Sequence, residues 1–295
     1  MSEVGVIGLG IMGSAMSTNL LESGFGIIGY DIDPGKVEAL VQKGGRPASS
    51  AGEVARAAEV VITSLPGDEA LLEVATGPEG LAATGREGLV VVESSTLALA
   101  TKERARRELA AAGIVLLDCP ISGTGAQAAR RDISVYASGD PEAVRRARPV
   151  LDAIARSTHY VGDFGTGLKL KLIANLLVAI HNVSTAEALV LGLKAGIDPQ
   201  TVLEVIGDGA GTSRMLEVRG PLMADQRYEE PTARVRMFKK DIQLISAFAA
   251  ELDCPTPLFS ASIDLYASAM SQGMGDYDAA AVCTVLERMA GIERG

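Results

Sequence analysis

The chain has 295 residues, which is long for one hydrophobic core and predicts two domains. A hydrophobic fraction of 47% with a charged fraction of 22% is typical of a folded globular protein. The net charge of −10 argues against nucleic acid or an anionic membrane surface as a partner, because both attract basic faces.

Strands and helices alternate over the first half. Apolar runs of strand length, separated by helical spacing, predict a parallel, doubly wound sheet that binds ligands at the carboxyl ends of its strands. The predicted strands are 4–10, 26–31, 58–66, 89–96 and 113–120. The predicted helices are 11–24, 34–44, around 70–74, 101–112 and 143–155, the last preceded by Asp140 as N-cap. We expect two later runs, 132–139 and 159–162, to join the same sheet.

The second half shows helical periodicity alone. The predicted helices are 168–194, 200–207, 213–224, 236–251, 257–272 and 278–291. The first of them would be about 40 Å long at 1.5 Å per residue, and we expect it to join the two domains. The chain therefore divides into a dinucleotide-binding domain of the Rossmann type, residues 1–163, and an all-helical substrate and oligomerisation domain, residues 164–295.

A glycine motif follows the first predicted strand and opens the first predicted helix. Its residues are Gly8, Leu9, Gly10, Ile11, Met12 and Gly13. In this context the first glycine allows a tight turn, the second lets a pyrophosphate approach the backbone, and the third brings the helix close to the sheet. The alternative interpretation is a tight turn without a ligand.

The cofactor type is indicated by Asp31, which ends the second predicted strand. A carboxylate there accepts hydrogen bonds from the adenosine ribose and repels a 2′-phosphate. Since no arginine follows it, NAD is favoured over NADP.

Two lysines lie in the apolar segment 165–177. Helical spacing places Lys171 on one face with Asn175, Val178 and Asn182, a polar stripe on an otherwise apolar helix. Lys169 shares its face with apolar residues and lies in the first turn, where its ammonium can extend past the helix end. Lys171 is therefore the candidate working residue, and a buried structural ion pair is its alternative.

Motifs along the whole chain resemble those of the β-hydroxyacid dehydrogenase family, which includes enzymes acting on 3-hydroxyisobutyrate, tartronate semialdehyde and L-threonate. The opening segment 5–24 is similar to the family's cofactor motif, and DCPISGT at 118–124 to its substrate loop. The spacing Gly162-x-x-Gly165-x-Gly167-x-x-x-Lys171-x-x-x-Asn175 is similar to its catalytic motif. KKD at 239–241 and GDYDAAA at 275–281 resemble its C-terminal signatures.

The resemblance implies a role for each matching residue. Lys171 would be the general acid/base at the C3 oxygen of a 3-hydroxy acid, and Asn175 would orient the substrate. The substrate carboxylate would be held by Ser122, Gly123 and Thr124. The cofactor would be contacted by Leu65, Pro66 and Thr96, and Lys240 would close the site. Chemistry agrees with the first role, because burial lowers the pKa of a lysine from about 10.4 towards the working range of a proton shuttle.

Composition argues against other dehydrogenases. Lactate- and malate-type enzymes need a catalytic histidine, and metal-dependent alcohol dehydrogenases need histidine or cysteine ligands. The two histidines, His159 and His181, are interpreted as structural. Cys119 has no histidine nearby in sequence and is interpreted as a small buried hydrophobe. We therefore expect no metal.

The substrate loop departs from the family pattern. Thr124 stands where a second glycine is usual, and Gln127 and Arg131 occupy positions often held by glycine. Loops carry specificity, so an unusual substrate is expected. Arg130, Arg131 and Arg214 would suit a second acidic group on the substrate, the alternative being solvated surface.

The combined interpretation is an NAD-dependent oxidoreductase acting on a small 3-hydroxy acid as a homodimer or homotetramer. Alternatives are an imine-reductase-like enzyme or semialdehyde reductase of the same superfamily, or a catalytically silent dinucleotide-binding module. Three widely spaced cysteines form no disulfide or metal pattern, which favours a reducing compartment. With no signal sequence and no apolar run long enough to cross a bilayer, we expect a cytoplasmic protein.

Overall fold

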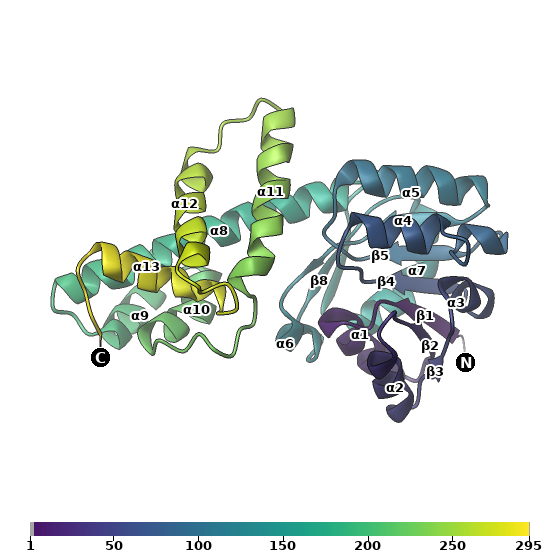
Figure 1. Cartoon of the computed structure of the whole chain (residues 1–295), viewed down its shortest axis with the longest axis horizontal. Helices are drawn as coiled ribbons and strands as arrows, with labels where there is room; N and C mark the ends of the chain where they lie inside the picture. The colour runs from purple at the N-terminus through teal and green to yellow at the C-terminus, as the bar shows by residue number, and fades with distance from the viewer. Residues whose placement is uncertain (1–2, 295) are drawn as a thin grey trace. The chain divides into compact units, whose positions relative to one another are not determined.

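The computed structural model describes residues 3–294. They divide into two compact units, the first ending at Lys171 and the second beginning at Leu172. All the described strands lie in the first unit, and the second consists of helices and their connections (Figure 1).

A six-stranded parallel sheet forms the centre of the first unit, in the order β3-β2-β1-β4-β5-β6. The strands are β1 (Glu3–Ile7), β2 (Gly26–Tyr30), β3 (Arg46–Pro47), β4 (Val60–Thr63), β5 (Val90–Glu93) and β6 (Val115–Asp118). The helices that accompany it are α1 (Ile11–Glu22), α2 (Pro34–Gln42), α3 (Ala51–Ala57), α4 (Asp68–Thr76), α5 (Leu99–Ala111) and α7 (Pro141–Ile154). The predicted doubly wound fold is confirmed.

The sheet is buried on both faces, which explains why its strands are continuous apolar runs. Side chains on one face, such as Val6 and Ile62, pack with α1 and α7. Side chains on the other, such as Val61 and Val91, pack with α3, α4 and α5. Because every strand runs in the same direction, the polar residues that follow β1, β2, β4, β5 and β6 gather at one edge of the sheet.

The expectation that the two late strands join this sheet is wrong. They form a separate three-stranded sheet, β7-β8-β9, of β7 (Ile121–Ser122), β8 (Ser134–Ala137) and β9 (Ser157–Tyr160). The Cys119 N–H still donates to the Glu93 carbonyl at 2.8 Å, and β7 begins two residues later. The chain therefore leaves β6 and turns into β7. An isolated antiparallel bridge between Asp118 and Ser138 connects the two sheets.

Several short elements were not predicted, including β3, α3, a 3₁₀ turn η1 (Ala82–Thr84) and α6 (Gly125–Ala128). Each is too short for helical or strand periodicity to be read in the sequence. Helix α3 did carry a start signal, because the Ser50 side chain accepts a hydrogen bond from the Glu53 N–H.

The six predicted helices of the second half are confirmed. They are α8 (Thr166–Lys194), α9 (Pro199–Gly207), α10 (Arg214–Ala224), α11 (Val235–Glu251), α12 (Pro257–Ser271) and α13 (Val282–Met289), the last preceded by a 3₁₀ turn η2 (Ala279–Ala281). Helix α8 is continuous through the division between the two units and is the predicted joining helix.

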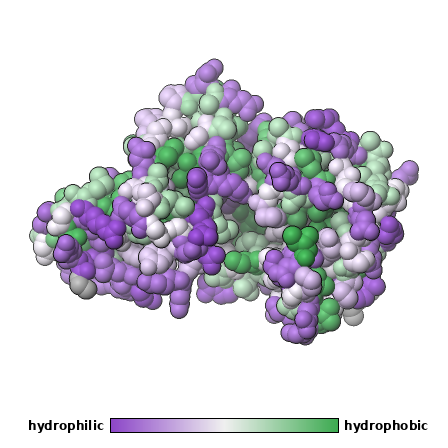
Figure 2. Space-filling view, viewed as in Figure 1, coloured by the Kyte–Doolittle hydropathy of each residue, from purple (hydrophilic) through white to green (hydrophobic). Residues whose placement is uncertain are grey.

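Helix α8 is long and apolar enough to cross a membrane by length and composition alone, and part of it is buried inside the protein. Ala179, Asn182, Ala186 and Leu189 are buried within the protein. In the view of Figure 2, hydrophilic side chains are spread over the surface of both units, with apolar side chains between them.

Candidate active site

The glycine motif forms the connection between β1 and α1. Gly8 has φ +88°, and a Cβ there would lie 2.1 Å from the Ser64 carbonyl oxygen. A Cβ on Gly13 would lie 1.9 Å from the Gly8 carbonyl oxygen. A Cβ on Gly10 would instead meet no atom within 4 Å. Gly8 and Gly13 are thus required by the protein's own packing, whereas Gly10 faces open space, which fits the close approach of a pyrophosphate.

The Asp31 carboxylate is held at the end of β2 by backbone N–H groups. Oδ2 accepts from Leu9 N at 2.7 Å, and Oδ1 accepts from Asp33 N at 2.9 Å. Oδ2 keeps a further lone pair for a ribose hydroxyl, whereas Oδ1 also accepts from Lys36 Nζ. Lys36 Nζ lies 3.4 Å from Oδ1, so a cation stands beside this carboxylate although no arginine follows it. The residues at the ends of β1 and β2 fit a dinucleotide.

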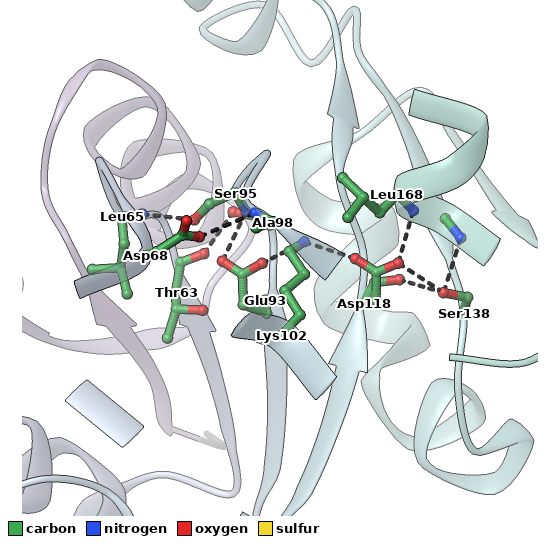
Figure 3. Close-up of polar contacts among 12 residues, drawn as sticks. Thr63, Leu65, Asp68, Glu93, Ser95, Ala98, Lys102, Asp118, Ser138 and Leu168 are labelled. Atoms are coloured by element: carbon green, nitrogen blue, oxygen red, sulfur yellow. Dashed lines mark hydrogen bonds and ion pairs between the residues drawn. The ribbon is translucent and has the colours of Figure 1, made fainter. Parts of the chain in front are cut away.

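The loops that follow β4 and β5 are tied to each other at the same edge of the sheet. Leu65 N donates to Ser95 Oγ at 2.8 Å, and Ala98 N donates to Asp68 Oδ1 at 3.0 Å (Figure 3). Thr96 lies between Ser95 and Ala98 in the loop after β5. The predicted cofactor residues of the first unit at this edge are Gly8, Leu9, Gly10, Ile11, Met12, Gly13, Asp31, Leu65, Pro66 and Thr96.

A buried ion cluster lies below these loops and was not predicted. Lys102 Nζ, on α5, is 2.6 Å from Glu93 Oε2 and 2.7 Å from Asp118 Oδ1, and all three side chains have an exposed fraction of 0% (Figure 3). Burial disfavours the charged ammonium, but the charges of Glu93 and Asp118 and their hydrogen bonds outweigh it and raise the pKa of Lys102. Lys102 therefore keeps its charge at neutral pH.

The first turn of α8 is held by two side chains of the first unit. Gly167 N donates to Ser138 Oγ at 3.0 Å, and Leu168 N donates to Asp118 Oδ2 at 2.8 Å (Figure 3). N–H groups of a first helical turn have no partner within their own helix, so these contacts cap α8. Lys171 follows one turn later.

The approach of α8 to the sheets is close enough to need glycine. A Cβ on Gly167 would lie 2.4 Å from the Tyr136 carbonyl oxygen. Beyond this contact Lys171 is partly buried, whereas Lys169 is exposed. The prediction that Lys169 extends from the helix towards solvent is confirmed.

The polar stripe after Lys171 continues into the second unit. Asn175 is 6% exposed, and its Nδ2 donates to Asp241 Oδ2 at 2.9 Å. Lys240 Nζ lies 3.8 Å from the other carboxylate oxygen of Asp241. Asp241 thus contacts Asn175 and Lys240, the two predicted site residues of this unit. No role was predicted for Asp241 itself.

Farther along the stripe the polar residues are structural. Asn182 is completely buried, and its Nδ2 donates to Tyr266 Oη at 3.0 Å and to the Ala279 carbonyl at 2.9 Å. The face that begins at Lys169 is not a uniform core stripe as expected, because Ile173 on that face is 50% exposed. Helical spacing therefore distinguished the partly buried Lys171 from the exposed Lys169, but it did not predict which apolar side chains of the helix are buried.

The predicted substrate loop is fixed by a capping box at α6. Thr124 N donates to Gln127 Oε1 at 3.0 Å, and Gln127 N donates to Thr124 Oγ1 at 3.4 Å. The Thr124 N–H, expected to hold a carboxylate, is thus already bonded to Gln127. Ser122 and Gly123 precede the box, and Gly123 has φ +142°, a backbone conformation that favours glycine.

Two of the three arginines considered for a second acidic group have partners. Arg131 Nη2 lies 3.3 Å from Glu22 Oε2, and Arg214 Nη1 lies 2.7 Å from Glu217 Oε2. Arg130 is exposed. These contacts favour the surface interpretation of Arg131 and Arg214.

The interpretation of Cys119 as a small buried hydrophobe is confirmed, whereas the structural interpretation of the two histidines stays a prediction. Cys119 is completely buried, and burial together with the nearby Asp118 charge raises the pKa of its thiol, which disfavours a nucleophilic thiolate. His159 is exposed on β9, and His181 lies on α8. Within residues 3–294, no three His, Cys, Asp or Glu side chains are grouped to hold a metal.

Comparison with known proteins agrees with this arrangement. Residues 3–162 match the family model described as the NAD binding domain of 6-phosphogluconate dehydrogenase. Residues 165–286 match the model described as NAD-binding of NADP-dependent 3-hydroxyisobutyrate dehydrogenase. The fold and the site thus define a two-domain, nicotinamide-dependent oxidoreductase.

Similar proteins cover nearly the whole chain. An L-threonate dehydrogenase of Cupriavidus necator is 35% identical over 96% of this chain and 95% of its own length. A 3-hydroxyisobutyrate dehydrogenase of Pseudomonas aeruginosa is 34% identical over 90% of this chain and 91% of its own. The crystal structure of a 3-hydroxyisobutyrate dehydrogenase from Salmonella typhimurium has a TM-score of 0.86 and 32% identity, covering 97% of this chain and 100% of that one. The chain belongs to the β-hydroxyacid dehydrogenase family.

Substitution of the glycines should separate stability from cofactor binding. Gly13→Ala places a Cβ against a backbone carbonyl, so we expect the free energy of unfolding to fall by about 2 kcal/mol, with weaker NAD binding. Gly10→Ala, at φ −66°, should leave the melting temperature unchanged while raising the Kd for NAD roughly tenfold, about 1.4 kcal/mol. Thermal melts and NAD titration test both. Wild-type NAD affinity in Gly10→Ala would contradict the assignment.

Charge at the end of β2 should set the cofactor preference. Asp31→Asn keeps the shape of the side chain, removes one negative charge and leaves Lys36 only the Asp33 carboxylate at 3.9 Å, so we expect the NADP to NAD ratio of kcat/KM to rise roughly tenfold. Lys36→Met should move the ratio in the opposite direction. Steady-state rates with each cofactor measure the ratio. An unchanged ratio in both variants would show that Asp31 and Lys36 do not distinguish a ribose 2′-hydroxyl from a 2′-phosphate.

Proposed function

We propose that this protein transfers a hydride between C3 of a small 3-hydroxy acid and NAD, with Lys171 as general acid/base. The observation that carries the proposal is the anchoring of α8. Its first turn is bonded to Asp118 and Ser138 at the edge of the sheet where the cofactor residues gather, and Lys171 is presented one turn later. Family membership and the hydroxy-acid dehydrogenases among its relatives support the same reaction.

In the oxidative direction the chain's residues bind the substrate and move one proton. Lys171 Nζ, as the neutral amine, takes the proton of the C3 hydroxyl and becomes an ammonium; in the reverse direction it returns that proton to the C3 oxygen. A bound nicotinamide accepts or supplies the hydride. Asn175 is held by Asp241 and orients the substrate beside Lys171.

The carboxylate of the substrate is assigned to Ser122 and Gly123. Thr124 remains in the loop, but its N–H bonds to Gln127, so a carboxylate has to rely on the preceding two residues or displace that bond. Lys240, which lies beside Asp241, is assigned to the cofactor. Identification of the particular 3-hydroxy acid falls to assay: 3-hydroxyisobutyrate, L-threonate, glycerate, serine and dicarboxylic analogues, each with NAD and NADP.

The domain, oligomer and location assignments belong to the same proposal. Residues 1–163 bind the dinucleotide, and residues 164–295 complete the substrate site and associate into a dimer or tetramer in the cytoplasm. The two matched segments, 3–162 and 165–286, support that boundary. Association is supported by apolar side chains that α8 leaves exposed: Ile173 at 50%, Leu177 at 47% and Leu191 at 72%.

Loss of Lys171 should remove the chemical step. For Lys171→Ala we expect kcat to fall about 100-fold or more with NAD binding retained, because positioned acid/base groups contribute roughly 10²–10⁴ in rate. Lys169→Ala, two residues earlier and exposed, is the matched control and should keep wild-type kcat. Nicotinamide absorbance follows turnover. Turnover that survives Lys171→Ala would overturn the assigned role.

Loss of the Ser122 hydroxyl should weaken substrate binding. A hydrogen bond to a charged group contributes about 1.5–3 kcal/mol, so Ser122→Ala is expected to lower kcat/KM roughly 10- to 100-fold, mainly through KM. Thr124→Val keeps the N–H of residue 124 that bonds to Gln127 but loses the Oγ1 that accepts from Gln127 N, and it should change KM less. Equal KM in wild type and Ser122→Ala would exclude the carboxylate contact.

A further inference from the structure

Lys102 has no place in the reaction as proposed, yet it is an ammonium with no solvent exposure. Glu93 and Asp118 are register partners on the parallel strands β5 and β6, so two carboxylates lie side by side in the core with Lys102 between them. Buried ion groups of this kind often add no stability over apolar residues of similar volume. A positional role is the alternative reason for the arrangement.

One side of the cluster supports the cofactor loop. Glu93 uses its second oxygen, Oε1, to accept from Ser95 N at 2.9 Å. Ser95 Oγ in turn accepts from Leu65 N at 2.8 Å. The carboxylate that pairs with Lys102 therefore fixes the loop that carries Thr96 and, through it, the loop after β4 (Figure 3).

The other side supports the helix that carries Lys171. Asp118 uses its second oxygen, Oδ2, to accept from Leu168 N at 2.8 Å, and Ser138 Oγ lies 3.1 Å from the same oxygen. Ser138 also accepts from Gly167 N at 3.0 Å. Two successive N–H groups of α8 are thus oriented by Asp118 and its neighbour.

We propose that Lys102 is a positioning residue for hydride transfer, which sets the cofactor loop at Thr96 and the Lys171 turn of α8 at a fixed separation by clamping Glu93 to Asp118. The inference rests on the proposed role of Lys171. Each carboxylate has one oxygen on Lys102 and the other on one of the two segments, so the ammonium is the centre of a continuous polar connection. A misplacement of about 1 Å in such an arrangement costs roughly 100-fold in rate.

The test uses the whole chain and five variants, of which Lys171→Ala is one. Lys102→Met removes the ammonium at similar volume, and Glu93→Gln/Lys102→Met/Asp118→Asn replaces the whole cluster by neutral side chains that keep acceptors for Ser95 and Leu168. Arg219→Met is the matched control, because Arg219 is 4% exposed and pairs with the buried Asp278 within the second unit. Lys102→Met/Lys171→Ala completes a double-mutant cycle.

For the folded variants, we expect kcat to fall about 10- to 100-fold in Lys102→Met and in the triple variant, with KM for NAD within about threefold of wild type. Arg219→Met should keep wild-type kcat per folded molecule. If Lys102→Met does not fold, as shown by circular dichroism, the neutral triple variant supplies the same comparison. Wild-type kcat in a folded variant of the cluster, or a loss confined to KM, overturns the proposal.

The double-mutant cycle separates positioning from general destabilisation. If Lys102 acts through Lys171, the loss caused by Lys102→Met should be at least fivefold smaller in the Lys171→Ala background. The same fractional loss in both backgrounds overturns the positioning role. Failure of the proposed function gives a different result, namely Lys171→Ala alone with wild-type turnover.

Discussion

The ammonium of Lys102 allows two carboxylates to stand opposite each other on adjacent strands of a buried sheet. Like charges in register repel, and neither has water to screen it. With the ammonium between them, the two carboxylates at the ends of β5 and β6 can accept hydrogen bonds from N–H groups of other segments. Glu93 accepts from the loop after β5, and Asp118 accepts from the beginning of α8.

The rest of the site follows from the same division between apolar strands and polar strand ends. Runs such as Val90–Val91–Val92 provide the buried sheet, and the residue that ends each run carries a polar group to the carboxyl edge. Asp31 follows β2, Glu93 ends β5 and Asp118 ends β6. At Gly13 and Gly167 the absence of a side chain lets backbone pack against backbone. Polar strand ends thus form the dinucleotide site and also anchor the first turn of α8.

Much of this arrangement was predictable because it depends on local pattern. The parallel, doubly wound sheet is implied by alternating strands and helices, and the glycine motif, Asp31 and Lys171 each stand at recognisable positions. The separate sheet of β7, β8 and β9 was not predictable from periodicity, because the hydrophobic pattern of a strand does not show which other strand it pairs with.

The ion cluster could not be found from sequence for a related reason. Lys102 lies on α5 among Glu103, Arg104, Arg106 and Arg107, so its charge looks like part of a solvated helix face. Its burial depends on residues 9 and 16 positions away. Similarly, Gln127 was noted as a departure from the family pattern, but its bond to the Thr124 N–H appears only in three dimensions.

Helix α8 also determines how the chain can be cut and recombined. The two units meet within a continuous helix rather than at a linker, so a fragment beginning at Leu172 would start mid-helix with its first N–H groups unsatisfied. A fragment ending at Lys171 would keep the cap but lose the helix that the cap serves. Chimaeras with other members of the family should therefore be joined before Thr166, at the turn containing Gly162 and Gly165 with φ +103° and +91°. Residues 118 and 138 lie before that junction, so the N-terminal partner has to carry Asp and Ser there to cap the helix it receives.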